Sequence, residues 1–124
     1  MPVYKAPVND TLFVLNDVLG LERYGNLQGF ADATPDMIEA IIGEAAKVAE
    51  EALFPINLSG DREGCTRNDD GTVLVPNGFK QAYDQYVQGG WIGLAGPEEV
   101  GGQGLPYTLH AAVGEYMSSA NMSL

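Results

Sequence analysis

The chain has 124 residues, with 17 Asp or Glu against 6 Lys or Arg and a net charge of -11. At 45% hydrophobic and 19% charged residues it is too apolar for a disordered protein, and its length suits one domain with a modest core. The few basic residues are scattered, which argues against nucleic acid or an anionic membrane surface as a partner.

The cysteine content and the apolar runs indicate the cellular compartment of the protein. A single cysteine, Cys65, excludes an internal disulfide and suits a reducing compartment. Residues 1–7 lack the apolar core of a signal peptide, and no apolar run approaches the roughly 18 residues of a membrane span. We therefore expect a soluble, cytoplasmic protein.

The first predicted helix follows the proline-containing residues 1–7. Asn9 or Asp10 is its expected N-cap, and Gly20 is its expected stop. Apolar residues are spread around much of this short helix, so we expect it to be largely covered, by its own domain or by a neighbour. The run from Gly20 to Ala33, which contains three glycines, should form a loop anchored by Leu27 and Phe30.

The clearest helix start is Thr34-Pro35-Asp36, which supplies an N-cap hydroxyl, a proline for the first helical position and an acid for the helix dipole. Apolar residues then recur at helical spacing over residues 34–53, which predicts an amphipathic helix packed on a core. Pro55 is predicted to end this helix.

Residues 57–77 are rich in polar and turn-forming residues. Asp69-Asp70-Gly71 predicts the turn of a small β-hairpin with strands near residues 65–67 and 72–75. Calcium binding by the acidic residues of this segment is the alternative, but the 12-residue calcium loop with its closing Glu is absent. We predict a solvated acidic surface and no metal site.

A third helix is predicted over residues 79–88, with Phe79, Ala82, Tyr83, Tyr86 and Val87 on one face. Residues 89–106 then hold seven of the 16 glycines and the only tryptophan. We interpret them as an elbow of fixed shape whose apolar residues, Trp91, Ile92, Leu94 and Val100, are buried.

A phosphate-binding loop is the alternative for this elbow. Gly102-Gln103-Gly104 begins a G-x-G pattern, but Tyr107 stands where the third glycine should be, and no β-strand precedes the pattern. Pro106 is predicted to open the last helix. This helix should continue to Leu124, and because no Gly, Pro or basic cap stands at its end, it is expected to be truncated there.

Chemically reactive residues are few. His110 is the only histidine, so the chain has no second histidine for a Ser-His-Asp arrangement and cannot form a histidine metal cluster. We predict a structural role for His110. Cys65 has only Arg62 and Arg67 as basic neighbours. Adjacent glutamates such as Glu50 and Glu51 point about 100° apart on a helix. Composition and spacing therefore predict no catalytic constellation.

Several segments resemble the amino-terminal helical domain of the flavin-dependent acyl-CoA dehydrogenases. The most specific is the elbow, with Gly90-Trp91-Ile92-Gly93-Leu94 and then Pro97-Glu98-Glu99-Val100-Gly101-Gly102-Gln103-Gly104-Leu105. The first 19 residues, with Tyr4-Lys5-Ala6-Pro7-Val8 and Phe13-Val14-Leu15, are similar to the extra N-terminal segment of a bacterial long-chain subgroup. The resemblance implies a mainly α, bundle-like domain with a small hairpin, divided into an extension (residues 1–33) and a helical domain truncated at its C-terminal end (residues 34–124).

In that family a glutamate takes the α-proton of an acyl-CoA and FAD takes a hydride from the β-carbon. The resemblance implies that this glutamate and most FAD contacts belong to other domains, so no residue here is assigned to catalysis or cofactor binding. It implies one wall of the acyl pocket, formed by the positions Met117, Ala120, Asn121 and Leu124.

Two functions follow from these expectations. The chain is either a part of an acyl-CoA dehydrogenase that is inactive alone, or a self-contained acidic helical module that binds a protein partner. Faces that normally pack on other domains would form an apolar patch in either case, so we expect a homo-oligomer.

Overall fold

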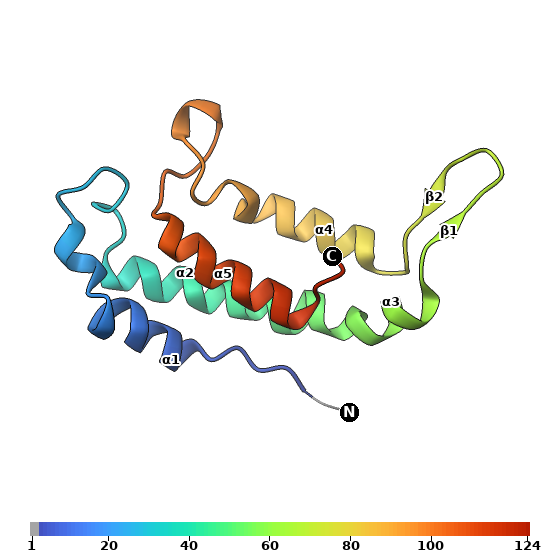
Figure 1. Ribbon diagram of the computed structural model, residues 1–124, viewed down its shortest axis with the longest axis horizontal. Coiled ribbons are helices and arrows are strands. Elements are labelled where there is room, and N and C mark those ends of the chain that lie inside the picture. The colour runs from blue at the N-terminus through green and yellow to red at the C-terminus, as the bar shows by residue number, and fades with distance from the viewer. Residues whose placement is uncertain (1–2) are drawn as a thin grey trace.

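Helix α2 (Pro35–Lys47) is the long central element of the structure, a computed structural model that describes residues 3–124 (Figure 1). Thr34 Oγ1 accepts a hydrogen bond of 3.3 Å from the Met37 backbone N–H, and Pro35 holds the first helical position. The predicted start of this helix is confirmed.

Helical structure continues past Pro55, so the predicted end of the helix is wrong. A π-helical segment (Val48–Leu53), a 3₁₀ turn (Phe54–Ile56) and helix α3 (Asn57–Glu63) follow α2 directly. Pro55 lies in the first turn of a new helical segment, where a backbone N–H would have no helical partner. The change of helix type therefore accommodates the proline without ending the helical path.

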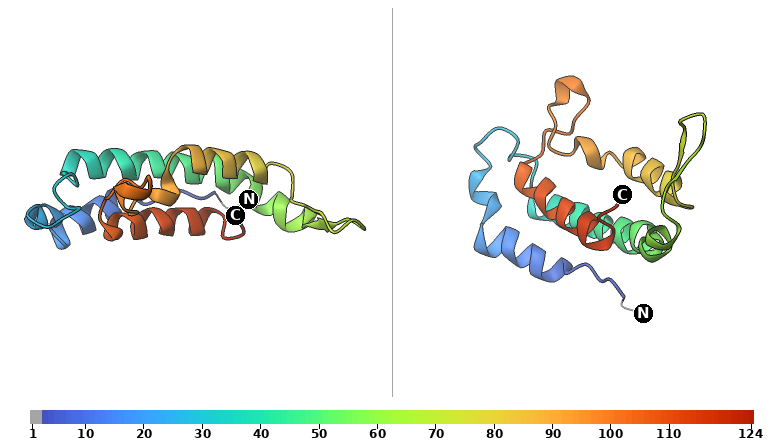
Figure 2. Two further views of the ribbon diagram at one scale, coloured as in Figure 1. Left: turned by 90° about the horizontal axis from the view of Figure 1, so that it is seen from above. Right: turned by 45° about the vertical axis from the view of Figure 1, so that its right-hand side comes forward.

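The helices form two layers, seen from above in Figure 2. Helix α2 and α4 (Phe79–Gln88) lie in one layer, and α1 (Val8–Leu12) and α5 (Tyr107–Ala120) lie in the other. Helical segments make up 61% of the described residues, which confirms the mainly α fold with one small hairpin among them. The core between the layers contains these fully buried side chains: Ile38, Ile42, Leu53, Leu94, Leu109, Val113 and Tyr116. Among the described residues, no helix is both long and apolar enough to cross a bilayer.

The N-cap of the first helix differs from the predicted one. It is Pro7, not Asn9 or Asp10, and the Pro7 carbonyl accepts hydrogen bonds from the N–H and the hydroxyl of Thr11. The helix continues as a π-helical segment (Phe13–Val18), and Gly20 then adopts φ +60°, the predicted break. Within this chain the helix is not largely covered, because Leu15 is its only buried residue.

The segment between the first helix and α2 includes a 3₁₀ turn (Leu21–Tyr24). Phe30 packs against the core as predicted, whereas Leu27 is 48% exposed and Leu21 is buried in its place. Leu21 follows Gly20 directly, and the left-handed turn at the glycine is the point at which the chain changes direction.

The hairpin is confirmed. Strands β1 (Thr66–Arg67) and β2 (Val73–Leu74) pair antiparallel, with Thr66 opposite Leu74. Figure 1 shows that they project away from the helices. At their base the Glu63 carboxylate accepts hydrogen bonds from the backbone and side-chain nitrogens of Asn77, both at 3.1 Å.

Helix α4 has the predicted bounds, and the elbow after it includes the 3₁₀ turns Trp91–Gly93 and Glu98–Val100. Trp91 and Leu94 are buried as expected, but Ile92 and Val100 are exposed. Backbone hydrogen bonds fold the second half of the elbow onto the first, with N–H donors at Gln103, Gly104 and Leu105 and acceptors at Gly93, Gly96 and Leu94. These bonds give the elbow its shape.

Helix α5 ends at Ala120, so the expectation that it runs to Leu124 is wrong. Asn121 has an extended backbone, with φ -160° and ψ 99°, and its carboxamide oxygen accepts hydrogen bonds from the backbone N–H and the hydroxyl of Ser123. These local bonds replace the next helical turn, as polar side chains near helix ends often do.

The N-terminal arm (residues 3–7) is fixed to the middle of the central helix by one carboxylate. Glu50 Oε2 accepts from Lys5 Nζ at 2.7 Å, and Glu50 Oε1 accepts from the Ala6 backbone N–H at 2.9 Å. The hydrogen bond from Lys5 holds the pKa of Glu50 below its ordinary value of 4.5.

We expect this contact to make stability depend on pH. Because the pKa of Glu50 is lower in the folded chain than in the unfolded chain, its contribution is full above pH 4.5 and is lost as the pH falls through the lowered value. Urea unfolding of the wild type and Glu50→Gln between about pH 3 and pH 7 should show a difference that shrinks in acid. A difference independent of pH would contradict this assignment.

Candidate functional site

An apolar hollow of about 190 Å³ opens where the C-terminal end of α5 meets α4 and the end of the π-helical segment Val48–Leu53. Eight residues line it: Leu53, Tyr83, Tyr86, Met117, Ser118, Asn121, Met122 and Leu124. Three of the four positions expected to form a pocket, Met117, Asn121 and Leu124, therefore share one hollow. Ala120 is not among them and lies 1% exposed in the core.

The remaining lining residues were not predicted from the sequence. Tyr83 and Tyr86 are three residues apart on one helical face, which is the one local signal that could have pointed to them. Leu53 and Met122 come from segments far apart along the chain, and no sequence pattern places either beside α4. Their convergence is a property of the tertiary fold.

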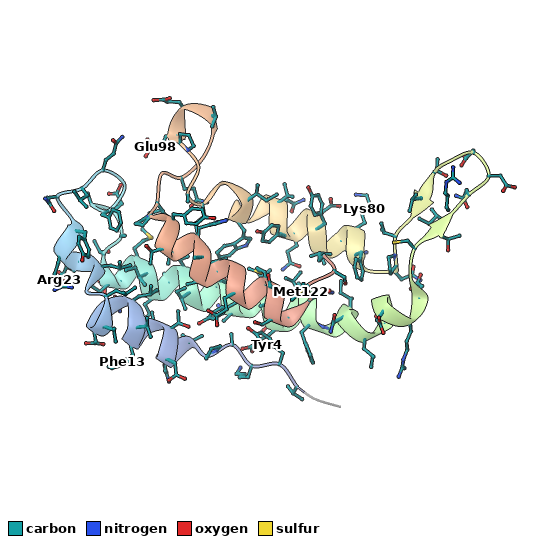
Figure 3. All side chains as sticks on the ribbon, in the orientation of Figure 1. Tyr4, Phe13, Arg23, Lys80, Glu98 and Met122 are labelled. Atoms are coloured by element: carbon teal, nitrogen blue, oxygen red, sulfur yellow. The ribbon has the colours of Figure 1, made fainter. Side chains whose placement is uncertain are left out.

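The hollow has a buried floor and an exposed rim. Leu53, Met117 and Asn121 are 1%, 8% and 4% exposed, whereas Tyr83 and Met122 are 51% and 83% exposed. Figure 3 marks Met122 beside the C-terminal end of α5. Burial raises the pKa of Tyr86, so this phenol is a neutral hydrogen-bonding group at pH 7 and no base. The hollow is suited to holding an apolar chain.

Asn121 joins the floor to the central helix. Its Nδ2 donates to the Leu53 carbonyl at 3.3 Å, in a buried bond between residues 68 positions apart. The Asn57 N–H, which would bond to this carbonyl in a regular α-helix, bonds to the Phe54 carbonyl instead. Asn121 thus adds a side-chain hydrogen bond to the carbonyl at the N-cap of the 3₁₀ turn.

Replacing Asn121 should therefore destabilise the fold as well as alter the hollow. Asn121→Ala removes the buried bond to the Leu53 carbonyl, and we expect a loss of about 1 kcal/mol in the free energy of unfolding. Urea denaturation measures it, with Ser118→Ala as the control because Ser118 is exposed on the same rim. Equal stability of the two variants would show that the Asn121 bond contributes nothing.

Among residues 3–124, the reactive side chains considered from the sequence lie in different elements. His110 stacks obliquely on Tyr107, at 5.3 Å between ring centroids, and its buried Nδ1 has no hydrogen-bond partner. Cys65 is exposed, and Glu98 and Glu99 form the first turn of a short 3₁₀ helix in the elbow. Within residues 3–124, no three His, Cys, Asp or Glu side chains gather as metal ligands would.

The elbow does not offer a phosphate site either. The N–H groups of Gly102, Gln103 and Gly104 donate to carbonyls of Pro97, Gly93 and Gly96 inside the elbow itself. The three lysines, at positions 5, 47 and 80, each pair with a carboxylate. Among the described residues, these elbow N–H groups and the lysines are therefore already engaged within the chain, whereas a pyrophosphate needs free N–H groups or cations.

Two curated proteins match the chain over nearly its whole length. A 3-methylmercaptopropionyl-CoA dehydrogenase of Ruegeria pomeroyi is 38% identical over 120 residues, and the match covers 97% of this chain and 20% of that protein. The chain is similar to the amino-terminal domain of acyl-CoA dehydrogenases. The broad-specificity linear acyl-CoA dehydrogenase FadE5 of Mycobacterium tuberculosis is 26% identical over 122 residues, with 98% and 20% covered. No family model matches.

The share covered limits what these relatives imply. The chain spans about a fifth of the length of each acyl-CoA dehydrogenase that it matches. The relationship that the matches show is therefore that of a domain.

Proposed function

We propose that the chain is part of an FAD-dependent acyl-CoA dehydrogenase and that the hollow at the end of α5 forms one wall of its acyl pocket. The carrying observation is that three positions named from the resemblance converge on one apolar hollow with a buried floor. At about 190 Å³ the hollow is smaller than a typical pocket for a whole ligand, roughly 300–1,000 Å³. It has room for part of an acyl chain.

This wall would exclude water from the acyl chain of the substrate and orient it. Leu53 and Met117 supply the apolar floor, and no carboxylate or imidazole lies among the lining residues. FAD would supply the acceptor for the hydride when bound, and we assign its contacts to other parts of the enzyme, as the family resemblance implies. The chain is expected to be inactive alone.

The substrate class follows from the relatives and the lining together. One relative is named for a thioether-containing acyl-CoA and the other for linear acyl-CoAs. The flexible side chains Met117 and Met122 beside Tyr83 and Tyr86 suit a narrow, unbranched chain, because methionine adapts to irregular space and sulfur packs well on aromatic rings. We propose a linear acyl-CoA as substrate.

The test begins with the native gene. The open frame that contains these codons should be expressed in full, and reduction of an artificial electron acceptor measured with straight-chain and branched acyl-CoAs. Met117→Trp should fill the floor and raise KM for the linear substrate more than it lowers kcat, whereas Val100→Ala, which is exposed in the elbow, should do neither. Absence of acyl-CoA-dependent reduction would refute the proposal.

The division into an extension (residues 1–33) and a helical domain (residues 34–124) remains part of this proposal, as does homo-oligomer formation. The alternative function, an acidic module that binds a protein partner, is favoured by one observation: Phe13, Val14 and Val18 on the first helix are 59%, 44% and 58% exposed. Figure 3 marks Phe13 on the outer side of that helix. A frame that stops at Leu124, with the chain retaining a partner in a pull-down, would support this alternative.

A further inference from the structure

The π-helical segment Val48–Leu53 is held from two sides by residues distant in the sequence. On one side Glu50 accepts hydrogen bonds from Lys5 and from the Ala6 backbone. On the other side the Leu53 carbonyl accepts from Asn121. Both contacts are thus made within four residues of one helical segment.

A π-helix needs such support more than an α-helix does. It is rare, occurs as short insertions and is frequently found at functional sites. Its end here coincides with a change of helix type and with the carbonyl that accepts the hydrogen bond from Asn121. The segment also supplies Leu53 to the floor of the hollow. Its position therefore decides where that floor lies.

Aromatic contacts strengthen the hold of the arm on this region. Tyr4 packs on Phe54, the residue after the π-helical segment, at 6.2 Å between ring centroids. Burial and the neighbouring Tyr116 raise the pKa of Tyr4. Figure 3 marks Tyr4 where the arm passes α5. The arm thus contacts the segment through both Glu50 and Phe54.

We propose that the N-terminal arm is a strap that positions the pocket wall through the π-helical segment. Glu50 is a positioning residue in this arrangement: it fixes the segment whose far end, Leu53, forms the floor with Asn121. The coupling belongs to the fold, and its consequence for acyl binding rests on the function proposed above.

Hydrogen exchange of the 124-residue chain tests the strap directly. Glu50→Ala should accelerate exchange about tenfold in residues 48–56 and in residues 116–124, as well as in the arm, because local opening would no longer be opposed. The matched control is Glu51→Ala, the neighbouring exposed glutamate, which has no hydrogen bond or ion pair within residues 3–124. Its exchange should match that of the wild type.

A milder variant keeps the test decisive if Glu50→Ala does not fold. Lys5→Ala removes the ion pair and keeps the Ala6 bond, so the same peptides should exchange faster by a smaller factor, about threefold. Faster exchange confined to residues 3–12 in either variant would overturn the strap, because the arm would then detach without moving the floor.

The strap and the proposed function can fail separately. In the full gene product, Glu50→Ala should raise KM for the linear acyl-CoA with kcat little changed. Altered exchange without any acyl-CoA activity in the wild type would refute the enzyme and keep the strap. Normal exchange in an active enzyme would refute the strap and keep the enzyme.

Discussion

Gly102→Ala is expected to destabilise the fold by about 3 kcal/mol, close to the upper end for overpacking a tight site. A Cβ atom at this position would overlap the backbone of Gly96, and a backbone cannot move aside as a flexible side chain can. Gly96 and Gly102 touch because the two halves of the elbow fold onto each other, with Gly104 donating to the Gly96 carbonyl at 2.9 Å. The change therefore forces the elbow open.

Gly96→Ala is the matched control for this prediction. It lies on the other side of the same contact, but its added Cβ would meet no atom closer than 3.4 Å. Urea unfolding should therefore separate the two variants by about 2 kcal/mol or more. If both variants unfold alike, the close approach of the two glycines is not what restricts position 102.

The sequence predicted the fold well where the structure of a segment depends on that segment's own residues. Thr34 and Pro35 start α2, and Gly20 breaks the first helix, because capping and positive φ depend on a few adjacent residues. The mainly α class and the hairpin were predicted for the same reason. The resemblance of the elbow then led to the acyl-CoA dehydrogenases, a relationship that the two curated matches confirm.

Contacts between segments that are distant in the sequence could not be predicted from such local signals. Pro55 alone predicts a helix end. The structure shows that the helical path continues through the 3₁₀ turn Phe54–Ile56, beside the hydrogen bond from Asn121 to Leu53. The end of α5 at Ala120 depends on the same asparagine. For the hollow, the sequence suggested Met117, Asn121 and Leu124 through the family, whereas Leu53 and Tyr86 required the packing of three separate elements.

The N-terminal segment illustrates the same difference. The N-cap of its first helix was assigned to Asn9 or Asp10, because only local chemistry could be considered, whereas the N-cap in the structure is Pro7. In the structure Ala6 and Leu15 belong to the same core as Ile38 and Ile42. The segment thus packs as part of the helical fold, whatever its boundary as a domain.

Tyr116→Ala is the second large effect, with an expected cost of about 3–5 kcal/mol, by analogy with other buried aromatic side chains. Tyr116 is 1% exposed in α5, and its hydroxyl donates to Thr11 Oγ1 at 2.6 Å, while Thr11 in turn donates to the Pro7 carbonyl at 3.0 Å. Burial raises the pKa of Tyr116, which keeps the phenol protonated as a donor. The residue therefore ties α5 to the first helix.

Two further variants separate packing from the hydrogen bond in this contact. Tyr116→Phe keeps the ring and should cost only about 1 kcal/mol, because Thr11 retains its bond to Pro7. Tyr107→Ala, in the first turn of the same helix and 74% exposed, should change stability by less than about 0.5 kcal/mol. If Tyr116→Phe costs as much as Tyr116→Ala, the hydroxyl rather than the ring holds the N-terminal segment. If neither Tyr116→Ala nor Tyr116→Phe loses stability, the N-terminal segment does not contribute to the stability of the other helices.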